Sequence, residues 1–415
     1  MEAATAPRPQ PTLAELAHLS RQEEAALLDA EQASPKKLAF KFKLMTWNIL
    51  AQCLIKRDQF PYITGTGTEN PLSTKIRSPL ILRAFDLHAP HIAALQEVCI
   101  DQWTHHLEKG LQARGYDFAY VKKDPTKKAG HGLAIVWKRD MFSMLGQKDI
   151  HFDDHPLTHP TPITPITGNI GVVVALKYLP QGAMDLFDFG VIVSNHHLFW
   201  WPKAKYEKLR QVYVLLEEVE SFRKQALMGW ERWPHAMCGD FNTTPSDALY
   251  RVLTSSSPLS PDLIASLEPV PLTKPQKGVP STGGSKPSSN DTTPCISDSV
   301  FSAITPTAFP SVPFLLDSIA RKGPFHSAYS LYRTHDPAHP DISTVTHPWD
   351  GEPSYTSVDE WRGTLDYLMV KRGGVLRALR VLKIPDPRWL EPGLPNLRFP
   401  SDHVPLMAEM GVERE

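Results

Sequence analysis

The sequence predicts a layered α/β fold, and three observations support this prediction. Short apolar segments typical of β-strands recur along the chain, and the first of them, at 38–44, has the two-residue period of a strand. One long segment, 203–227, shows the spacing of an amphipathic helix instead. The composition, with 41% hydrophobic and 21% charged residues, is that of a globular protein. At 415 residues the chain can bury one large domain or two small ones.

The N-terminal segment, residues 1–36, is expected to be a tail with one peripheral helix. It begins with a Pro/Ala-rich stretch, and Thr12-Leu13-Ala14-Glu15 then matches a helix-capping box. Good helix formers follow to about Ala33. Nothing in this segment indicates catalysis, so we assign the main domain to residues 37–412.

The main domain is expected to begin with a strand whose apolar residues alternate with others, namely Leu38, Phe40, Phe42 and Leu44. Further apolar strands are predicted at 91–96, 132–137, 171–176, 189–194, 236–238 and 364–370. One face of the helix at 203–227 carries Leu209, Val212, Leu216 and Val219. Strands separated by helices in this way favour a single layered domain.

Residues at about 254–313 differ in composition from the rest of the chain. Serine, proline, threonine and glycine dominate them, as in Gly283-Gly284-Ser285. Such a stretch buries too little apolar area to offset its chain entropy. We therefore expect a disordered Ser/Pro-rich insertion within the domain.

Charge, thiols and the N-terminus restrict where the protein acts. The formal net charge is −1, so no global positive field draws the chain to nucleic acid. The cysteines, Cys53, Cys99, Cys238 and Cys295, form no C-x-x-C pair and are expected to be reduced thiols. No apolar run reaches the roughly 18–20 residues that cross a bilayer, and the N-terminus lacks a secretory pattern. We expect an intracellular protein, cytoplasmic and/or nuclear, with no membrane association.

Polar residues recur at the ends of the predicted strands. The set comprises Asn48, Glu97, His197, Asp240, Asn242 and Asp366, and Asp402-His403 follow the last loop. In a layered α/β fold, strand ends on one edge meet at one crevice. Carboxylate and amide oxygens suit a hard divalent cation, whereas softer metals prefer thiolates or imidazoles. The pattern therefore predicts a site for Mg²⁺, with Mn²⁺ as a substitute.

Each member of this set also has an ordinary structural interpretation. Turn formers are common at positions such as Asn48, and Glu97 can cap the helix that follows it. Asp240 in Gly239-Asp240-Phe241-Asn242 can form an Asx turn. The order and type of the whole set, rather than any single residue, favour a functional site.

Six motifs in sequential order suggest a family. They are Met45-Thr46-Trp47-Asn48-Ile49-Leu50, Leu95-Gln96-Glu97-Val98, His197-Leu198-Phe199-Trp200, Gly239-Asp240-Phe241-Asn242, Leu365-Asp366-Tyr367 and Ser401-Asp402-His403. Together they resemble the ordered motifs of the endonuclease/exonuclease/phosphatase superfamily. Within it, the chain is similar to the branch of Ccr4-like deadenylases, nocturnin and the Ngl-type RNA exonucleases, and most of all to the Ngl type. The resemblance implies a four-layer α-β-β-α sandwich.

The resemblance implies a metal site at one side of the crevice. By this likeness Glu97 would hold a magnesium ion, with Asn48 oriented nearby and Asp402 beside the metal. Oxygen ligands of this kind agree with the preference of Mg²⁺.

The resemblance also implies roles in phosphate chemistry. Asp240 would position or activate the attacking water, and Asn242 would hold a non-bridging oxygen. His403, oriented by Asp366, would contact the scissile phosphate, and His197 would be a further phosphate contact. Pairing with a carboxylate favours the charged form of His403, so we expect an electrostatic donor rather than the sole base.

A terminal base would bind at two further positions. In the deadenylases that this chain resembles, a proline and an aromatic residue pack on that base, and the matching residues are Pro202 and Trp361. Stacking of this kind is worth about 1–3 kcal/mol per base and tolerates any sequence. Core packing is the alternative for Trp361. A local basic rim is expected beyond Pro202, from Lys203, Lys205, Lys208 and Arg210.

Two adjacent histidines leave one phosphate contact open. Relatives usually carry threonine before the central histidine, and this chain has His196 there. The following Leu198-Phe199-Trp200 favours His197 as the contact.

The residues and the resemblance together predict a magnesium-dependent 3′-to-5′ exoribonuclease that trims or deadenylates RNA and releases 5′-nucleotides. Its partner would be the single-stranded 3′ end of an RNA, and we expect a monomer. The alternatives are a nocturnin-like dinucleotide phosphatase and a non-catalytic scaffold that binds RNA or protein. The complete set of acidic and histidine positions disfavours the scaffold.

Overall fold

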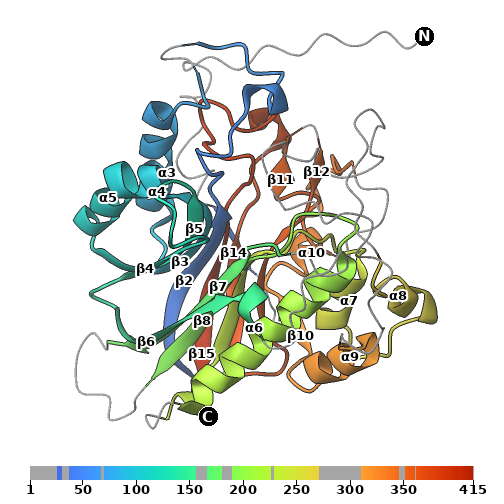
Figure 1. Cartoon of the computed structure of the whole chain (residues 1–415). Helices are drawn as coiled ribbons and strands as arrows, with labels where there is room; N and C mark the ends of the chain where they lie inside the picture. Colours follow the sequence, from blue (N-terminus) through green and yellow to red (C-terminus); the bar gives the residue numbers. More distant parts are fainter. Residues whose placement is uncertain are drawn as a thin grey trace, which may run out of the picture.

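Two β-sheets pack face to face, with helices on both outer faces (Figure 1). The computed structural model describes residues 26–29, 37–66, 70–155, 166–179, 189–225, 229–270, 310–344, 351–359 and 361–414. The arrangement is the four-layer α-β-β-α sandwich that the sequence predicts. No helix in these ranges is long and apolar enough to cross a membrane.

The first sheet has seven strands in the order β1-β14-β15-β2-β3-β5-β4. Their bounds are β1 (Leu27–Asp29), β2 (Leu38–Asn48), β3 (Ile92–Cys99), β4 (Tyr116–Lys122), β5 (His131–Lys138), β14 (Leu376–Leu382) and β15 (Leu406–Glu413). Strands β2 and β3 run parallel, and the other paired strands are antiparallel.

The second sheet has six strands in the order β10-β13-β9-β8-β7-β6. Their bounds are β6 (Phe142–His151), β7 (Ile170–Tyr178), β8 (Gly190–His197), β9 (His235–Asp240), β10 (Phe325–Ser327) and β13 (Asp366–Lys371). Here β8 and β9 are the parallel pair. A separate two-stranded hairpin is formed by β11 (Ser357–Val358) and β12 (Arg362–Gly363).

The helices divide between the two outer faces (Figure 1). On the first sheet lie α3 (Thr74–His88), α4 (Ile100–Gln102) and α5 (Glu108–Ala113), with a π-helical segment at Trp103–Leu107. On the second lie α6 (Lys205–Gln225), α7 (Ala248–Thr254) and α9 (Val312–Ala320). Short helices are α8 (Pro261–Ala265) and α10 (Tyr332–His335), and 3-10 turns lie at Arg57–Gln59, Phe152–Asp154, Trp230–Arg232 and Pro387–Trp389.

The central strands are apolar on both faces because both faces are covered. Phe42 and Leu44 of β2 pack between the sheets, whereas Met45 and Trp47 pack outward with Phe85 of α3. Burial of each such side chain stabilises the fold by about 1.5–3 kcal/mol. A strand buried on two faces shows little alternation, which is why β2 changes from alternating to continuous near its end.

The sequence-based elements are largely confirmed. The expected strands correspond to β2, β3, β5, β7, β8, β9 and β13, and the expected long helix is α6. The apolar face predicted for that helix is buried against the second sheet, through Leu209, Val212, Leu216 and Val219.

The expected N-terminal helix is wrong where the structure can test it. Residues Leu27–Asp29 form β1, which pairs antiparallel with β14, instead of continuing a helix to Ala33. Hydrogen bonding to an available sheet edge overrides the helix propensity of the segment. The other residues of 1–36 lie outside the described ranges.

Both ends of the expected insertion at about 254–313 are folded. Ser260 caps α8, since its hydroxyl accepts a bond from the amide of Leu263, and Leu267 is fully buried. Helix α9 begins at Val312. Residues up to 270 therefore pack on the domain, and the expected disorder of 271–309 lies outside the described ranges.

Candidate active site

Strand register brings three polar side chains to one edge of the second sheet. His197, the last residue of β8, lies opposite Asp240, the last residue of parallel β9. Asp366, the first residue of antiparallel β13, lies opposite the same Asp240. Neighbouring strands thus place two carboxylates and an imidazole side by side.

A bulge in β3 turns Glu97 toward this edge. The register of β3 with β5 shifts between Leu95 and Val98, and Glu97 has a φ of 55°. Leu50 and Asn242 also have positive φ, at 57° and 48°. Strained backbone of this kind costs about 1–3 kcal/mol and concentrates at functional sites.

Asn48 connects the two sheets through their carboxylates. Its Nδ2 donates to Glu97 Oε1 at 3.2 Å and to Asp240 Oδ2 at 3.1 Å. Its Oδ1 accepts from the amide of Leu50 at 3.0 Å, and Glu97 Oε2 accepts from the amide of Ala51 at 2.8 Å. The loop after β2 therefore fixes both the amide and the carboxylate.

His403 is held by a carboxylate behind it. Its Nδ1 lies 2.8 Å from Asp366 Oδ2, and the Thr356 hydroxyl donates to the same oxygen at 2.6 Å. Nε2 then lies 3.9 Å from Asp240 Oδ2. Burial alone would lower the pKa of His403, but Asp366, Asp402 and Asp240 raise it well above its ordinary value. The ring is therefore cationic at neutral pH.

The loop that carries His403 is bonded to the end of β2. The Ser401 hydroxyl donates to the carbonyl of Asn48 at 2.6 Å, and it accepts from the amide of His403 at 3.2 Å. Trp47 Nε1 donates to the carbonyl of His403 at 2.9 Å. These bonds fix the imidazole relative to Asn48.

The structure separates the two adjacent histidines. His197 Nε2 lies 3.5 Å from Asp240 Oδ2, and its side chain is 21% exposed. His196 is fully buried, lies edge-on to Phe241, and neither ring nitrogen has a hydrogen-bond partner among the described residues. Burial lowers the pKa of His196 to about 3, so its ring is neutral. His197 therefore faces the cluster, as the sequence favours.

Two hydrogen bonds fix Asn242, one from its backbone amide and one from its side chain. Its amide donates to Asp240 Oδ1 at 2.8 Å, and its Nδ2 donates to the carbonyl of Leu198 at 3.0 Å. Lys208 Nζ donates to the Asn242 carbonyl, and burial lowers the pKa of Lys208 to about 8. One hydrogen of the Asn242 side-chain amide remains for a further acceptor.

The expected basic rim is wrong for two of its four members. Lys208 is buried under Asn242, and Arg210 is buried in an ion pair with Glu207 at 2.7 Å. Lys203 is exposed and Lys205 is partly exposed. The amphipathic pattern of α6 places Lys208 and Arg210 on the covered side of the helix, where charges pair rather than meet solvent.

Of the two residues proposed to bind a base, Trp361 lies on a hairpin that is attached to the cluster. Trp361 is partly exposed in the turn between β11 and β12, where its amide donates to Asp359 at 2.6 Å. The amide of Val358 in β11 donates to the Asp402 carbonyl at 2.7 Å, so this hairpin is attached to the His403 loop. Pro202 is exposed in the turn before α6. Partial exposure disfavours core packing for Trp361.

The donor set fits a hard divalent ion. Burial raises the pKa of Asp402 to about 7; His403 opposes this shift, and the nearby Glu97 carboxylate adds to it. A cation beside both carboxylates would offset their repulsion. Ligand atoms of Asp240, Asp366 and His403 also lie within 4.8 Å of one another, and Asp366 Oδ1 is buried with no partner in the described ranges. Both groups are rich in oxygen, as Mg²⁺ and Mn²⁺ require.

Arg77 is a supporting residue that the sequence interpretation missed. It is fully buried in α3, and its Nε donates to the carbonyl of Pro400 at 2.6 Å. Its Nη1 donates to Gln52 Oε1 at 2.7 Å, and its Nη2 donates to the carbonyls of Ile49 and Leu50. One guanidinium therefore joins the loop after Asn48 to the residue before Ser401-Asp402-His403.

A sequence signal for Arg77 was present. It lies four residues before Ile81 and eight before Phe85, so it continues the apolar face of α3. An arginine in such a row must be paired, because a buried charge is costly alone. Thr356, whose hydroxyl donates to Asp366, could not be recognised in the same way. Nothing in the sequence distinguishes a buried loop threonine from an exposed one.

The fold and this site define a hydrolase of the nuclease and phosphatase class. The chain belongs to the Endonuclease/Exonuclease/phosphatase family, whose sequence profile matches residues 45–403. The match spans all six motifs, from the strand that ends at Asn48 to the loop that ends at His403.

Relatives within the family are named as RNA exonucleases. The chain is 32% identical to RNA exonuclease NGL2 of Saccharomyces cerevisiae over 57% of its length, but this covers only 46% of that relative. It is 28% identical to the Probable RNA exonuclease C9B6.11c of Schizosaccharomyces pombe, over 91% of the chain and 77% of the relative.

A solved structure supports the fold. The crystal structure of ANGEL2, a 2′,3′-cyclic phosphatase, in complex with adenosine-2′,3′-vanadate superimposes with a TM-score of 0.59. The match covers 92% of this chain and 100% of that one, at 22% identity.

Proposed function

We propose that the chain is a magnesium-dependent 3′-to-5′ exoribonuclease that shortens single-stranded RNA and releases 5′-nucleotides. The observation that carries the proposal is the position of Asp240. It is bonded to Asn48, which also holds Glu97, and it faces the ring of His403, which Asp366 holds from behind. The names of the relatives support RNA as the substrate.

Glu97 and Asp402 would hold the ion, with Asn48 fixing the orientation of Glu97. Burial raises the pKa of Asp402 and the nearby Glu97 carboxylate adds to this shift, and a cation between the two carboxylates would offset both effects. His403 Nδ1 and Asp366 Oδ2 are already bonded to each other, which makes these two atoms less suited to be ligands. When bound, Mg²⁺ would neutralise charge on the phosphate oxygens.

The remaining groups would act on the water and the phosphate. Asp240 would orient a water for attack on phosphorus, so that the new P–O bond forms as the bond to the 3′ oxygen breaks. The 3′ oxygen takes a proton and stays on the shortened RNA, and the phosphate leaves on the 5′ carbon of the released nucleotide. His403, His197 and Asn242 would donate to the oxygens where negative charge develops.

The 3′-terminal base would pack on Trp361 and Pro202. The attachment of the β11–β12 hairpin to the His403 loop supports this position. Stacking selects a single-stranded end without selecting its sequence. We propose that a monomer is sufficient and that the substrate is an intracellular RNA.

The test is the digestion of 5′-end-labelled RNAs that differ in their 3′ sequences, with Mg²⁺, with Mn²⁺ or with excess EDTA. We expect a ladder that shortens from the 3′ end, release of 5′-nucleotides, and no activity in EDTA. Glu97→Gln should abolish activity, whereas Glu108→Gln on α5 should not. Internal cleavage, or full activity in EDTA, would refute the proposal. Phosphate release from a dinucleotide with no RNA shortening would favour the dinucleotide phosphatase instead.

A further inference from the structure

Two cysteines are in contact beside the carboxylate cluster. The Cys53 thiol donates a hydrogen bond to the sulfur of Cys99, which also accepts from the backbone amide of Cys53. Both are free thiols, and Cys53 is exposed whereas Cys99 is buried. A disulfide joins two sulfur atoms at about 2.05 Å, so a pair already in contact needs only a local movement to form one.

Backbone amides fix the buried sulfur of this pair. Cys99 is the last residue of β3, and its sulfur accepts from the amides of Asp101 and Gln102 in addition to that of Cys53. Cys53 lies in a turn that is closed by a bond from the amide of Leu54 to the carbonyl of residue 51 at 2.9 Å. A disulfide would therefore join the loop after β2 to the end of β3.

The same two segments hold Glu97. Ala51, two residues before Cys53, donates its amide to Glu97 Oε2 at 2.8 Å. Glu97 itself lies two residues before Cys99, in the bulge of β3. Movement of Cys53 toward Cys99 therefore disturbs the loop that fixes the Glu97 carboxylate.

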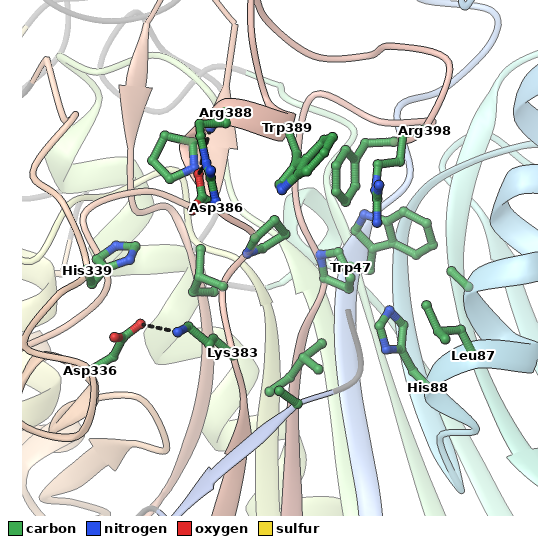
Figure 2. Close-up of a pocket in the computed structure, with 18 of the residues that line it drawn as sticks. Trp47, Leu87, His88, Asp336, His339, Lys383, Asp386, Arg388, Trp389 and Arg398 are labelled. Carbon is green, nitrogen blue, oxygen red and sulfur yellow. Dashed lines mark hydrogen bonds and ion pairs between the residues drawn. The ribbon is translucent and has the colours of Figure 1, made fainter. Parts of the chain in front are cut away.

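The pair is accessible from solvent through Cys53. Its side chain is exposed, and neither cysteine lines the cavity beside α3 that Figure 2 shows. Cys238, by contrast, is buried in the core between the sheets. Redox-sensitive cysteines are commonly accessible and lie next to a second thiol that resolves the first adduct.

We propose that Cys53 and Cys99 are a reversible oxidation site, at which a disulfide forms and weakens the metal site. The oxidant is a small disulfide such as oxidised glutathione. The Cys53 sulfur attacks one sulfur of the oxidant, breaks its S–S bond and releases one glutathione. The Cys99 sulfur then attacks the Cys53 sulfur and releases the second. The protein thiols lose two electrons and two protons, which leave with the two glutathione thiols.

The effect on metal binding rests on the proposed function, in which Glu97 holds Mg²⁺. Oxidation displaces the loop that carries the Ala51 amide, so the bond from this amide to Glu97 is weakened. We expect Mg²⁺ to bind about tenfold more weakly, the usual loss of one charge-assisted hydrogen bond. Reduction of the disulfide restores the affinity.

The first test detects the disulfide and requires no activity. The folded full chain is incubated in EDTA with oxidised glutathione, free thiols are blocked with iodoacetamide, and unreduced peptides are mapped by mass spectrometry. We expect a peptide pair joined through Cys53 and Cys99 that disappears after dithiothreitol treatment. Cys53→Ser should remove the pair. Cys295→Ser, in the Ser/Pro-rich segment, is the matched control and should leave it unchanged.

The second test compares Mg²⁺ binding by titration calorimetry before and after oxidation. The oxidised wild-type chain and Cys295→Ser should bind about tenfold more weakly than their reduced forms. Cys53→Ser should show the same affinity under both conditions. In dithiothreitol, its hydrolysis of a small phosphodiester should match that of the wild type.

Three results would overturn the proposal. They are absence of the Cys53–Cys99 peptide pair, its formation only after the chain is unfolded in urea, and equal Mg²⁺ affinity of the oxidised and reduced chains. A chain that forms the disulfide and loses Mg²⁺ affinity on oxidation, but hydrolyses no RNA when reduced, would refute the proposed function and support the oxidation site. The two failures are therefore distinguishable.

Discussion

At the scale of single residues, Asp240 lies at the centre of the cluster, close to Asn48, His197 and His403. Its Oδ2 lies 3.1 Å from Asn48 Nδ2 and 3.5 Å from His197 Nε2. Burial raises its pKa, His197 and His403 oppose that shift, and Asp366 adds to it. A carboxylate tuned in this way is suited to orient a water and accept its proton.

Asp240→Asn should lower kcat by about 10²–10⁴-fold, the usual contribution of a positioned acid or base. The amide keeps the shape of the carboxylate but cannot accept a proton. RNA binding should stay near the wild-type value, because the proposed role is toward the water. Single-turnover kinetics and fluorescence anisotropy measure the two effects, with Asp317→Asn as the exposed control. A variant that loses binding and keeps kcat would assign Asp240 to the RNA chain.

Arg77→Lys tests whether the buried guanidinium positions the metal site. Lysine keeps the charge but cannot make the several directed bonds that reach Pro400, Gln52 and the carbonyls after Asn48. The Mg²⁺ concentration for half-maximal activity should rise about tenfold, since one charge-assisted bond is worth that factor. Arg83→Lys on the same helix is the control. A lower melting temperature with unchanged Mg²⁺ dependence would show that Arg77 serves stability alone.

At the scale of elements, the sequence predicts strands whose apolar residues are continuous or alternate regularly, as in β2, and misses strands whose apolar pattern is interrupted. In β6 only Phe142 and Ile150 are buried, so no apolar run marks it. In β14 and β15, arginines and glutamates interrupt the pattern, as the ion pair of Arg377 with Glu413 illustrates. Neighbouring strands bury and pair the residues of these strands, and the local sequence does not show this effect.

The same limit applies to the site. Most of its motifs could be predicted because they lie at the end of an apolar strand, as Asp240 is the last residue of β9. The bulge that turns Glu97 and the hydroxyl of Thr356 on Asp366 depend on distant segments. Contacts between distant segments leave no periodic pattern in the sequence from which they could be predicted.

The β11–β12 hairpin gives a prediction about substrate capture. Trp361→Ala should weaken binding of single-stranded RNA by about 1–3 kcal/mol, with a similar loss for every terminal base. Hydrolysis of a small phosphodiester, which has no base to stack, should change much less. Binding by anisotropy and kcat/KM on both substrates measure the difference. Equal losses on both would mean that Trp361 supports the fold of the hairpin.

The segment between α8 and α9 is predicted to tolerate replacement by a shorter linker. Replacing 272–308 with a shorter Gly/Ser linker should leave activity and melting temperature near the wild-type values, since loop length changes closure entropy slowly. Extending the replacement to 258–310 should destabilise the fold by about 2–5 kcal/mol, because it removes buried Leu267 and the bond from Tyr206 to the Pro310 carbonyl. Thermal unfolding of both variants checks this. Loss of folding in the shorter replacement would show that 272–308 packs on the domain.

At the scale of the whole molecule, close packing of four layers buries histidines that no reaction uses. Burial lowers the pKa of His196 to about 3 and those of His88 and His339 to about 4. Each takes up a proton in the unfolded chain at a higher pH, with a pKa near 6.5. The unfolded state therefore binds more protons than the folded state between these values, and the folded state loses stability as pH falls below about 6.5.

His196→Phe isolates one of these contributions. Phenylalanine fits beside Phe241 and carries no titratable group, and neither nitrogen of His196 has a partner to lose among the described residues. Between about pH 7.5 and pH 5 the variant should lose about 2 kcal/mol less stability than the wild type. The raised pKa of Asp402 acts in the opposite direction, but it is common to both proteins and cancels in the difference. Urea unfolding of both proteins in EDTA at the two pH values measures it. Parallel losses in the two proteins would mean that His196 titrates normally in the fold.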